Sequence, residues 1–475
     1  MGIVTKAKFS EISKSHYLFT TFNFFRLRKL IDEDLLFLQV RLSEYFEIVS
    51  GFAFSSKDYT DTGVSVCRIG NISKYNELLI DEMLKLPEEY VDDYSKYIIQ
   101  NNDILIGLTG DGKFFKSCFV ENLDFPILLN QRVAIIRVKQ NIQDVSPKFV
   151  SLLFNSDKLQ NQIRIVAMGK TQKNVSPFDI LNVKIPKLDL DTQFALLQLI
   201  QPIEIEITNL KNSKLKPVDI MNNVLGEEFD FNWETFEKLK KQKTYSSNLN
   251  EFANNIDCRM GLKFHNLAGK YLHSFLISKT TKRVKDFIVE PIVLGKSVSP
   301  SDYDEDGECF YIAMSNIKTY SFDPEDCKKV SEDYSNINLK KTVQKGDILL
   351  ARSGEGTIGK VALIEDEDLN AIFADFTQRI RLTNYNTLFA YYYFRSEFFQ
   401  YLVYTHKKGL GNNTNIFPSQ IQEFPIPDWN PAKQTEIVEK IKTKIDAQNV
   451  IDKKIEQKQQ EINDIIESVI KGHQN

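Results

Sequence analysis

The chain has 475 residues, of which 42% are hydrophobic and 26% are charged, and its formal net charge is −4. This length argues against a single core and predicts two domains with connecting helices, and the composition is that of a soluble globular protein. The acidic balance argues against binding of nucleic acid through overall charge, so any affinity for DNA must come from local basic loops. No apolar run approaches the roughly 20 residues that cross a bilayer, and the first residues lack the layout of a signal peptide, so no membrane partner is expected.

The cysteines and histidines are scattered and do not predict a metal site. No Cys-x-x-Cys pair occurs, and no two histidines have zinc-ligand spacing. The five cysteines are Cys67, Cys118, Cys258, Cys309 and Cys327. We expect a reducing, cytoplasmic location and no disulfides. The acidic runs are typical of solvated turns, and no pattern predicts a catalytic centre.

One sequence pattern occurs twice. An apolar run, a glycine-rich turn and a second apolar run make up residues 345–364 (KGDILLARSGEGTIGKVALI), and residues 101–120 (NNDILIGLTGDGKFFKSCFV) follow the same plan. Asp103 and Asp347 lie 244 positions apart (347 − 103). Further pairs keep the same order with small shifts in offset, as loop insertions produce. These pairs are Gly51/Gly295, Tyr59/Tyr303, Asn71/Asn316, Gln131-Arg132/Gln378-Arg379, Asn174/Asn415, Pro177/Pro418, Pro186/Pro427 and Gln193/Gln434. We therefore predict two copies of one domain.

In chain order, the sequence predicts two domains and two helical regions. Short β-branched runs between Gly, Asp and Asn turns predict strands in a first domain at 1–187. A helical region at 188–225 and a polar linker at 226–284 lead into the second domain at 285–427. A second helical region occupies 428–475. The expected fold is α/β (mixed α+β), with two tandem domains separated by long antiparallel coiled-coil helices.

Apolar stripes in both helical regions predict helix pairing. The first stripe, with spacings of three and four, comprises Leu196, Leu199, Ile203, Ile207 and Leu210. Pro202 and Pro217 are expected to kink or end this helix. The second region carries a seam that alternates three and four residues. Its aliphatic members are Ile437, Ile441, Ile451, Ile455, Ile462, Ile465 and Val469. The alternative is an amphipathic helix that packs on its own domain.

Two polar, glycine-led loops stand at equivalent places in the two copies but differ in content. The first contains Lys170, Gln172, Lys173 and Asn174; the second has Lys407, Lys408, Asn412, Asn413, Thr414 and Asn415. These side chains supply donors and acceptors for DNA, the lysines for phosphates and the amides for base edges. The alternative is a pair of surface loops that bind nothing. Different polar loops on one scaffold favour the reading of two different sequences.

The glycines of residues 354–359 match the dinucleotide-binding fingerprint, but their context does not. Such a site needs a helix after the turn, whose N-terminus holds the phosphate. Residues 360–364 (KVALI) instead predict a strand, and a P-loop would require Ser or Thr where Val361 stands. A nucleotide-binding enzyme is therefore the weaker hypothesis.

The ordered, doubled set of motifs resembles the specificity subunit of type I restriction–modification systems. The match rests on the paired residues above, on ILIGLTGDG and ILLARSGEG, and on a helix after each copy; it covers most of residues 45–470. The resemblance implies two target-recognition domains that each read one part of a split DNA site, separated by helices that set the spacer. It also implies a non-catalytic chain, with methyltransferase and restriction subunits as partners that use S-adenosylmethionine, ATP and Mg. The alternatives are a type II-like system with a combined methyltransferase and nuclease partner, and a coiled-coil scaffold that does not bind DNA.

Overall fold

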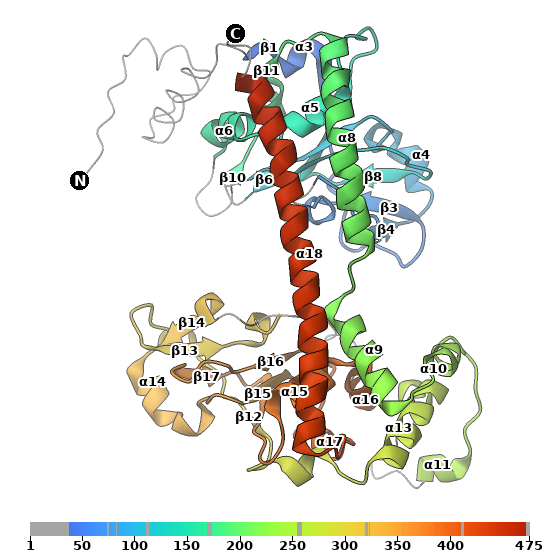
Figure 1. The fold of residues 1–475 in the computed structure, drawn as a ribbon, viewed down its shortest axis with the longest axis vertical. Coiled ribbons are helices and arrows are strands. Elements are labelled where there is room, and N and C mark those ends of the chain that lie inside the picture. Colours follow the sequence, from blue (N-terminus) through green and yellow to red (C-terminus); the bar gives the residue numbers. More distant parts are fainter. Residues whose placement is uncertain are drawn as a thin grey trace. The chain divides into compact units, whose positions relative to one another are not determined.

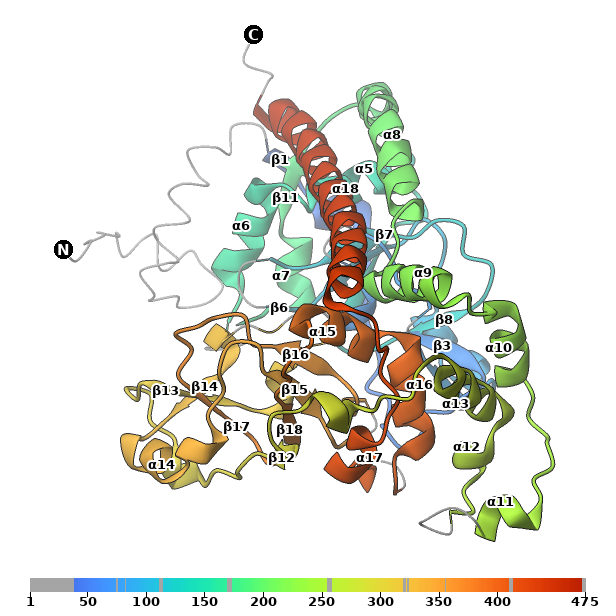
Figure 2. The same ribbon diagram turned by 60° about the horizontal axis from the view of Figure 1, so that its bottom comes forward.

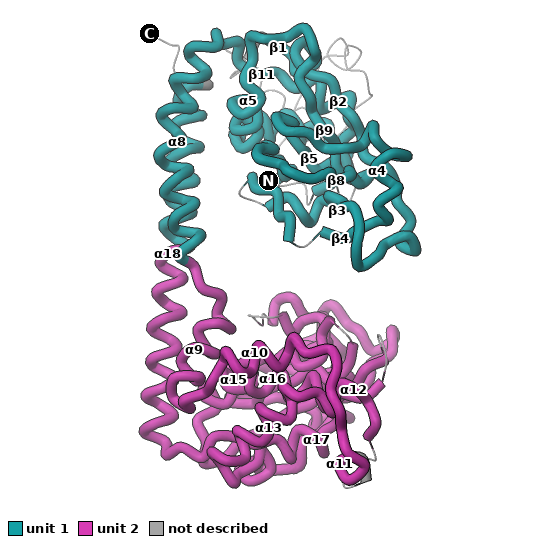
Figure 3. The backbone as a smooth tube through the Cα atoms, turned by 90° about the vertical axis from the view of Figure 1, so that its right-hand side faces the viewer, with its two compact units in different colours: residues 1–213, 452–475 teal, residues 214–451 magenta. Residues whose placement is uncertain are grey.

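The computed structural model describes residues 38–73, 76–81, 83–110, 114–168, 173–253, 259–318, 322, 324–354, 356–409 and 413–471. The chain divides into two compact units, unit 1 (residues 1–213 and 452–475) and unit 2 (residues 214–451), which Figure 3 shows in different colours. The long helix α18 (Pro431–Lys471) contributes its first part to unit 2 and its last part to unit 1.

Unit 1 is built on a four-stranded antiparallel sheet and a three-stranded sheet that share one core. In order, the first comprises β2 (Phe46–Ser50), β9 (Val133–Val138), β5 (Ile104–Gly107) and β7 (Ser117–Phe119). The second comprises β4 (Leu84–Leu86), β3 (Val64–Cys67) and β8 (Ile127–Leu129), with β3 and β8 parallel. Short pairs join β1 (Leu38–Arg41) to β11 (Lys184–Pro186) and β6 (Thr109–Gly110) to β10 (Lys173–Asn174). The helices are α3 (Leu42–Tyr45), α4 (Tyr90–Asp93), α5 (Pro147–Leu153), α6 (Asp157–Val166), α7 (Pro177–Leu181) and α8 (Leu190–Asn212).

Unit 2 has sheets of the same form. The four-stranded sheet comprises β12 (Val293–Leu294), β18 (Thr377–Ile380), β15 (Ile348–Ala351) and β16 (Val361–Leu363), and the other comprises β14 (Lys328–Val330), β13 (Cys309–Ile312) and β17 (Ala371–Phe373). Its further helices are α9 (Pro217–Phe229), α10 (Trp233–Lys240), α11 (Leu249–Ala253), α12 (Leu262–His265), α13 (Leu267–Lys279), α14 (Glu332–Ile337), α15 (Thr387–Arg395), α16 (Glu397–His406) and α17 (Pro418–Gln422). Figure 1 labels most of these elements.

The two units repeat one topology, which confirms the predicted duplication. The central strands pair in the same register: Leu105 faces Ile135 in unit 1, and Leu349 faces Arg379 in unit 2. Both pairs are related by an offset of 244, which persists through the central strand of each sheet. The sequence-based match of Gln131 with Gln378, at 247, is therefore wrong: at an offset of 244, Gln131 corresponds to Asp375 and Gln378 to Ala134.

The same buried ion pair recurs in both units. In unit 1, Asp103 is 1% exposed and its carboxylate accepts two hydrogen bonds of 2.7 Å from Arg137. In unit 2, Asp347 is 0% exposed and accepts bonds of 2.7 and 2.8 Å from Arg381. These hydrogen bonds raise the pKa of both arginines. A carboxylate at this depth requires such a partner.

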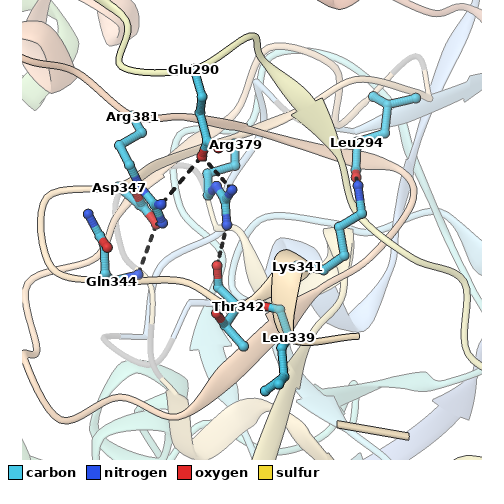
Figure 4. A network of polar contacts seen from close by, with 9 residues as sticks. All are labelled: Glu290, Leu294, Leu339, Lys341, Thr342, Gln344, Asp347, Arg379 and Arg381. Carbon is cyan, nitrogen blue, oxygen red and sulfur yellow. Dashed lines mark hydrogen bonds and ion pairs between the residues drawn. The ribbon is translucent and has the colours of Figure 1, made fainter. Parts of the chain in front are cut away.

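Unit 2 extends this pair into a larger polar cluster. Glu290 lies between Arg379 and Arg381, with Oε1 2.6 and 3.3 Å from the two guanidinium groups (Figure 4). Arg379 also donates to the carbonyl oxygen of Thr342. In unit 1 the position of Arg379 is taken by Ile135, so the additional cluster belongs to the second copy alone.

A buried glutamine joins the helix after each domain to that domain. Gln193, in the first turn of α8, is 3% exposed; its Oε1 accepts from the backbone N of Ser146 at 2.8 Å, and its Nε2 donates to the carbonyl of Leu188 at 2.9 Å. In α18 Gln434 makes the equivalent bonds. The predicted pair of glutamines therefore has one structural role in both copies.

The helical regions pair within each unit, and the structure corrects two expectations about the first of them. In unit 1, α8 and α18 run side by side and antiparallel (Figures 1 and 2), and Lys458 Nζ lies 3.0 Å from Glu206 Oε2. α8 continues through Pro202, which is exposed; the helix ends instead at residue 212, and Pro217 begins α9. Leu199 is 63% exposed and does not belong to the packed stripe.

Geometry explains which side chains of these helices are buried. Ile200 takes the place predicted for Leu199, because a period of 3.6 residues puts it on the face of Ile203 and Ile207. On α18, Ile455 and Ile462 are buried, and Ile437 and Ile441 are buried in the core of unit 2, whereas Ile451, Ile465 and Val469 are half-buried and Ile466 is buried at 2% exposure. Leu196 and Leu210 are half-buried.

Residues 226–284, for which the sequence predicts a linker, are largely helical in their described part. α10, α13 and α16 lie side by side (Figure 2), and Phe236, Leu272 and Leu276 are buried in the core of unit 2. The polar run at 238–255 led the sequence reasoning to miss the amphipathic helices on either side of it. Among the described residues, no helix is long and apolar enough to cross a membrane.

Candidate nucleic-acid interface

In each unit, three chain segments meet at one end of the four-stranded sheet. They are the turn before the central strand (130–132 and 374–376), the glycine-rich segment after its neighbour (108–110 and 352–354), and the described parts of the polar loop (168–175 and 408–416). We call these residues the three-segment surface of each unit. Because β5 and β9 are antiparallel, the end of one strand and the start of the other lie at the same edge, as they do for β15 and β18.

Backbone hydrogen bonds hold the three segments of unit 1 together. Leu108 N donates to the carbonyl of Arg132 at 2.9 Å, and Val175 N donates to the carbonyl of Leu108 at 3.0 Å. The polar loop is closed by two bonds between Met168 and Asn174, of 2.8 and 2.7 Å. The loop therefore starts and ends at fixed points beside the sheet.

Unit 2 repeats these bonds with different residues. Arg352 N donates to the carbonyl of Phe376 at 2.9 Å, and Ile416 N donates to the carbonyl of Arg352 at 2.9 Å. The loop closes through bonds of 2.8 and 2.7 Å between Lys408 and Asn415. The pair that closes it spans one residue more than in unit 1, so the same frame carries loops of different length and content.

Of the residues predicted for DNA binding in the first loop, two lie within the described part. Asn174 is exposed and Lys173 is half-buried, and both belong to β10. Lys170 and Gln172 lie outside the described residues, so their predicted roles stay predictions.

In the second loop, one predicted contact residue is buried. Asn413 is exposed, and Asn415 is half-buried with its Nδ2 donating to the carbonyl of Asn413 at 3.0 Å. Thr414 is 2% exposed and faces the protein, because the Gly354 amide bonds to its carbonyl and draws this residue against the glycine-rich segment. This burial argues against the predicted contact of the Thr414 side chain with DNA. Asn412 lies outside the described residues.

Lys407 and Lys408 lie at the end of α16 beside exposed aromatic rings. Lys407 Nζ is 5.7 Å from the ring of Tyr404, and Lys408 Nζ is 5.9 Å from that of Phe417. The two rings are 39% and 38% exposed. Lys263, from the region expected to be a linker, places its Nζ 5.3 Å from the same Tyr404 ring. The chain, although acidic overall, thus gathers positive charge beside the second polar loop.

Arg259 anchors the start of this loop. Its guanidinium donates to the carbonyls of His406 and Lys407 at 2.7 and 2.9 Å and lies 4.5 Å from the ring of Phe264. The carbonyls at the end of α16 have no helical partners, so this arginine satisfies them. Sequence reasoning missed Arg259 and Lys263, because they lie in a polar stretch with no pattern that predicts a helix, a strand or a binding site.

The glycine-rich turn is a hairpin turn, as the sequence predicted. β15 and β16 pair antiparallel, and Gly354 and Gly359 have φ of +84° and +88°, a conformation that favours glycine. A strand follows this turn, so it lacks the helix N-terminus on which nucleotide phosphates bind. Among the described residues, no group of three or more His, Cys, Asp or Glu side chains is placed to hold a metal ion.

Comparison with known proteins gives one family. The model of the type I restriction modification DNA specificity domain matches residues 37–217 and 278–463. The chain is 26% identical over 192 residues to the type I restriction enzyme MjaVIII specificity subunit of Methanocaldococcus jannaschii, covering 39% of this chain and 44% of that protein. It is 30% identical over 129 residues to the EcoAI specificity subunit of Escherichia coli, covering 26% and 21%. The chain thus spans less than half the length of these curated relatives in the matched regions.

Two solved structures resemble this one at low identity. A chain from work on complex assembly and conformational transition of the type I R-M system is 14% identical, with a TM-score of 0.45, over 91% of this chain and 97% of that one. The S subunit from M. genitalium is 14% identical, with a TM-score of 0.35, over 90% and 94%. Because the family model matches both copies and most of the residues, the chain belongs to the type I restriction modification DNA specificity domain family.

Proposed function

We propose that this chain is the sequence-specific DNA recognition subunit of a type I restriction–modification system. Residues 1–187 and 285–427 would each read one part of a bipartite duplex site, and the helical regions at 188–225 and 428–475 would set the unread spacer. The chain would direct methyltransferase and restriction subunits to that site. It would have no catalytic activity or cofactor of its own, and S-adenosylmethionine, ATP and Mg would act in the partners.

One observation carries this proposal. Both units present the same three-segment surface on the same hydrogen-bonded frame, yet the side chains on it differ: Asn174 and Arg132 in unit 1, and Lys408, Asn413 and Arg352 in unit 2. Phosphates are the same in every sequence, whereas base edges differ, so two frames with different polar content are suited to two different sequences. The family match supports the type I system over a type II-like arrangement.

The test is the methylated motif in cells that express this chain with its neighbouring methyltransferase. We expect a split motif that disappears without the chain. Exchange of residues 285–427 for those of another family member should change one half of the motif and leave the other half and the spacer length unchanged. Replacing Gln172 and Asn174 together by alanine should relax only the half that unit 1 reads. Methylation that does not depend on the chain would exclude the proposal.

A salt titration separates the scaffold alternative. A subunit that contacts several phosphates binds duplex DNA more weakly as salt rises, because neutralised phosphates release counterions. We expect the purified complex of this chain with its methyltransferase to show a steep dependence. A scaffold that does not bind DNA would give affinities that match those of the methyltransferase alone.

A further inference from the structure

We propose that Arg132 in unit 1 and Arg352 in unit 2 determine specificity by each binding the edge of a guanine in the major groove. The inference rests on the proposed function and assigns within it two contacts that lie outside the polar loops. It follows from the placement, the free donors and the non-equivalence of the two arginines.

Arg352 forms a hydrogen bond within its own domain that leaves most of its guanidinium donors unused. Its Nε donates to the carbonyl of Asp375 at 3.0 Å, and its guanidinium lies 5.8 Å from the ring of Phe376, which is 47% exposed. Among the described residues, its two Nη groups form no hydrogen bond or ion pair, and the side chain is partly exposed. One bond therefore fixes the plane of the guanidinium and leaves its outer donors for a ligand with two adjacent acceptors.

Arg132 presents the corresponding donors in unit 1. It is exposed, and in the described part of the chain its side chain has no hydrogen-bond or ion-pair partner. Its carbonyl accepts from Leu108 N, which ties it to the three-segment surface beside the exposed Asn174. Among the described residues, no carboxylate forms an ion pair with this cation, so its donors are available to a ligand.

The two arginines do not occupy equivalent positions. At the common offset of 244, the residue equivalent to Arg352 is Leu108, and the residue equivalent to Arg132 is Phe376. The same surface therefore carries its arginine on a different segment in each copy. A phosphate contact would serve both copies alike, since the DNA backbone is the same, whereas a base contact must differ between half-sites. Guanine O6 and N7 are the acceptors that an arginine fork matches best.

The other arginines of the central strands show the contrast. Arg137 and Arg381 each donate from Nε and Nη2 to the carboxylates of Asp103 and Asp347, so this edge of each guanidinium is not available to DNA. Arg379 is 5% exposed. Burial, or hydrogen bonds to a carboxylate of the protein, distinguishes these structural arginines from Arg132 and Arg352.

The test compares methylated motifs in cells that express the full chain, or a variant, with its methyltransferase. Arg352→Lys keeps the charge but loses the planar fork. We expect the preference for G·C at one position of one half-site to fall about 10- to 100-fold, with the other half-site unchanged. Arg132→Lys should do the same at one position of the other half-site. Unfolding midpoints equal to that of the wild type establish that the variants fold.

Matched controls come from the opposite ends of the same strands. Lys345 precedes β15 and Lys139 follows β9, so both lie at the strand ends opposite the three-segment surface. Lys345→Ala and Lys139→Ala each remove one exposed positive charge there. Both should leave the motif unchanged. If Arg352→Ala and Arg132→Ala lower affinity equally for all duplexes, with a shallower salt dependence and an intact motif, they contact phosphates and the inference is wrong. Unchanged motif and affinity would also overturn it, while the wild-type motif would still uphold the proposed function. Absence of any wild-type motif would exclude both.

Discussion

The carboxylate of Asp347 accepts two hydrogen bonds from Arg381 at 2.7 and 2.8 Å, and it does so with no exposure to solvent. The pair joins the start of β15 to the residue that follows β18, so it holds the two central strands in register. The residue pair 244 positions earlier, Asp103 and Arg137, has the same geometry. This contact is therefore part of the frame that both copies require.

Replacing Asp347 by alanine should lower the free energy of unfolding by roughly 3 kcal/mol, because Arg381 would lose the carboxylate that binds its Nε and Nη2, and the backbone N of Gln344 would lose its acceptor. Urea unfolding of the full chain measures this loss. Lys285→Ala is the control, since its pair with Glu423 is exposed and should contribute no more than about 1 kcal/mol. Equal effects of the two variants would mean that the buried pair is not structural.

Gly51 should not tolerate alanine, because a Cβ there would lie 2.2 Å from the carbonyl oxygen of Asn130. We expect Gly51→Ala to destabilise unit 1 by about 1–3 kcal/mol or more, since a rigid backbone must move. Gly70→Ala is the matched variant, with no atom within 4 Å of the added carbon. Hydrogen exchange of β2 and β9 measures the effect, and protection that is the same in both variants would contradict the prediction.

Unit 2 should lose stability in mild acid through His406. Burial, followed by the charges of His273 and Arg259, lowers the pKa of His406 from 6.5 to about 4, and its Nδ1 bonds to the carbonyl of Leu402. The unfolded chain therefore takes up this proton first, so stability falls as the pH drops from about 6.5 towards 4, by up to about 3 kcal/mol. Above pH 7.5 the group has no effect.

The check is thermal unfolding at pH 7 and pH 5 for the wild type and for His406→Asn, which keeps a donor but does not titrate. We expect the variant to show the smaller drop in unfolding temperature between the two conditions. A drop equal to that of the wild type would place the acid sensitivity elsewhere.

On α18, Ile466 should matter more than Ile465, although the heptad seam assigns 465 to the interface. Ile466 is 2% exposed and Ile465 is half-buried. Ile466→Ala should cost about 2–4 kcal/mol and Ile465→Ala clearly less, while Leu199→Ala on α8 should change stability by no more than about 0.5 kcal/mol. Chemical unfolding of the three variants gives the order, and a larger loss for Leu199 would contradict the packing described here.

Much of the frame could be predicted because it is local in sequence. The runs that follow Asp103 and Asp347 are continuous and apolar, which predicts buried strands, and the glycines after them predict the turn. Gln193 and Gln434 could be matched as a pair in the sequence, but their bonds to the domains appear only in the structure. Each of these patterns is weak in one copy, and their recurrence in a second copy is what made them recognisable.

Other features depend on contacts between distant segments. Arg137 lies 34 residues from Asp103, and only strand register reveals that they pair. Thr414 looks like any other loop residue until a backbone bond to Gly354 turns it inward. Arg352 and Phe376 become neighbours only when the hairpin and the central strand come together. Sequence reasoning therefore found the loops but missed the segments beside them.

The buried bonds of Gln193 have a mechanical consequence. They tie the first turn of α8 to the chain before α5 and to Leu188, so α8 cannot turn about its own axis without breaking these buried and partly buried hydrogen bonds. A torque applied to α8 is therefore transmitted to the body of unit 1 instead of being absorbed at the joint. A protein that binds α8 and rotates it would therefore rotate unit 1 as well.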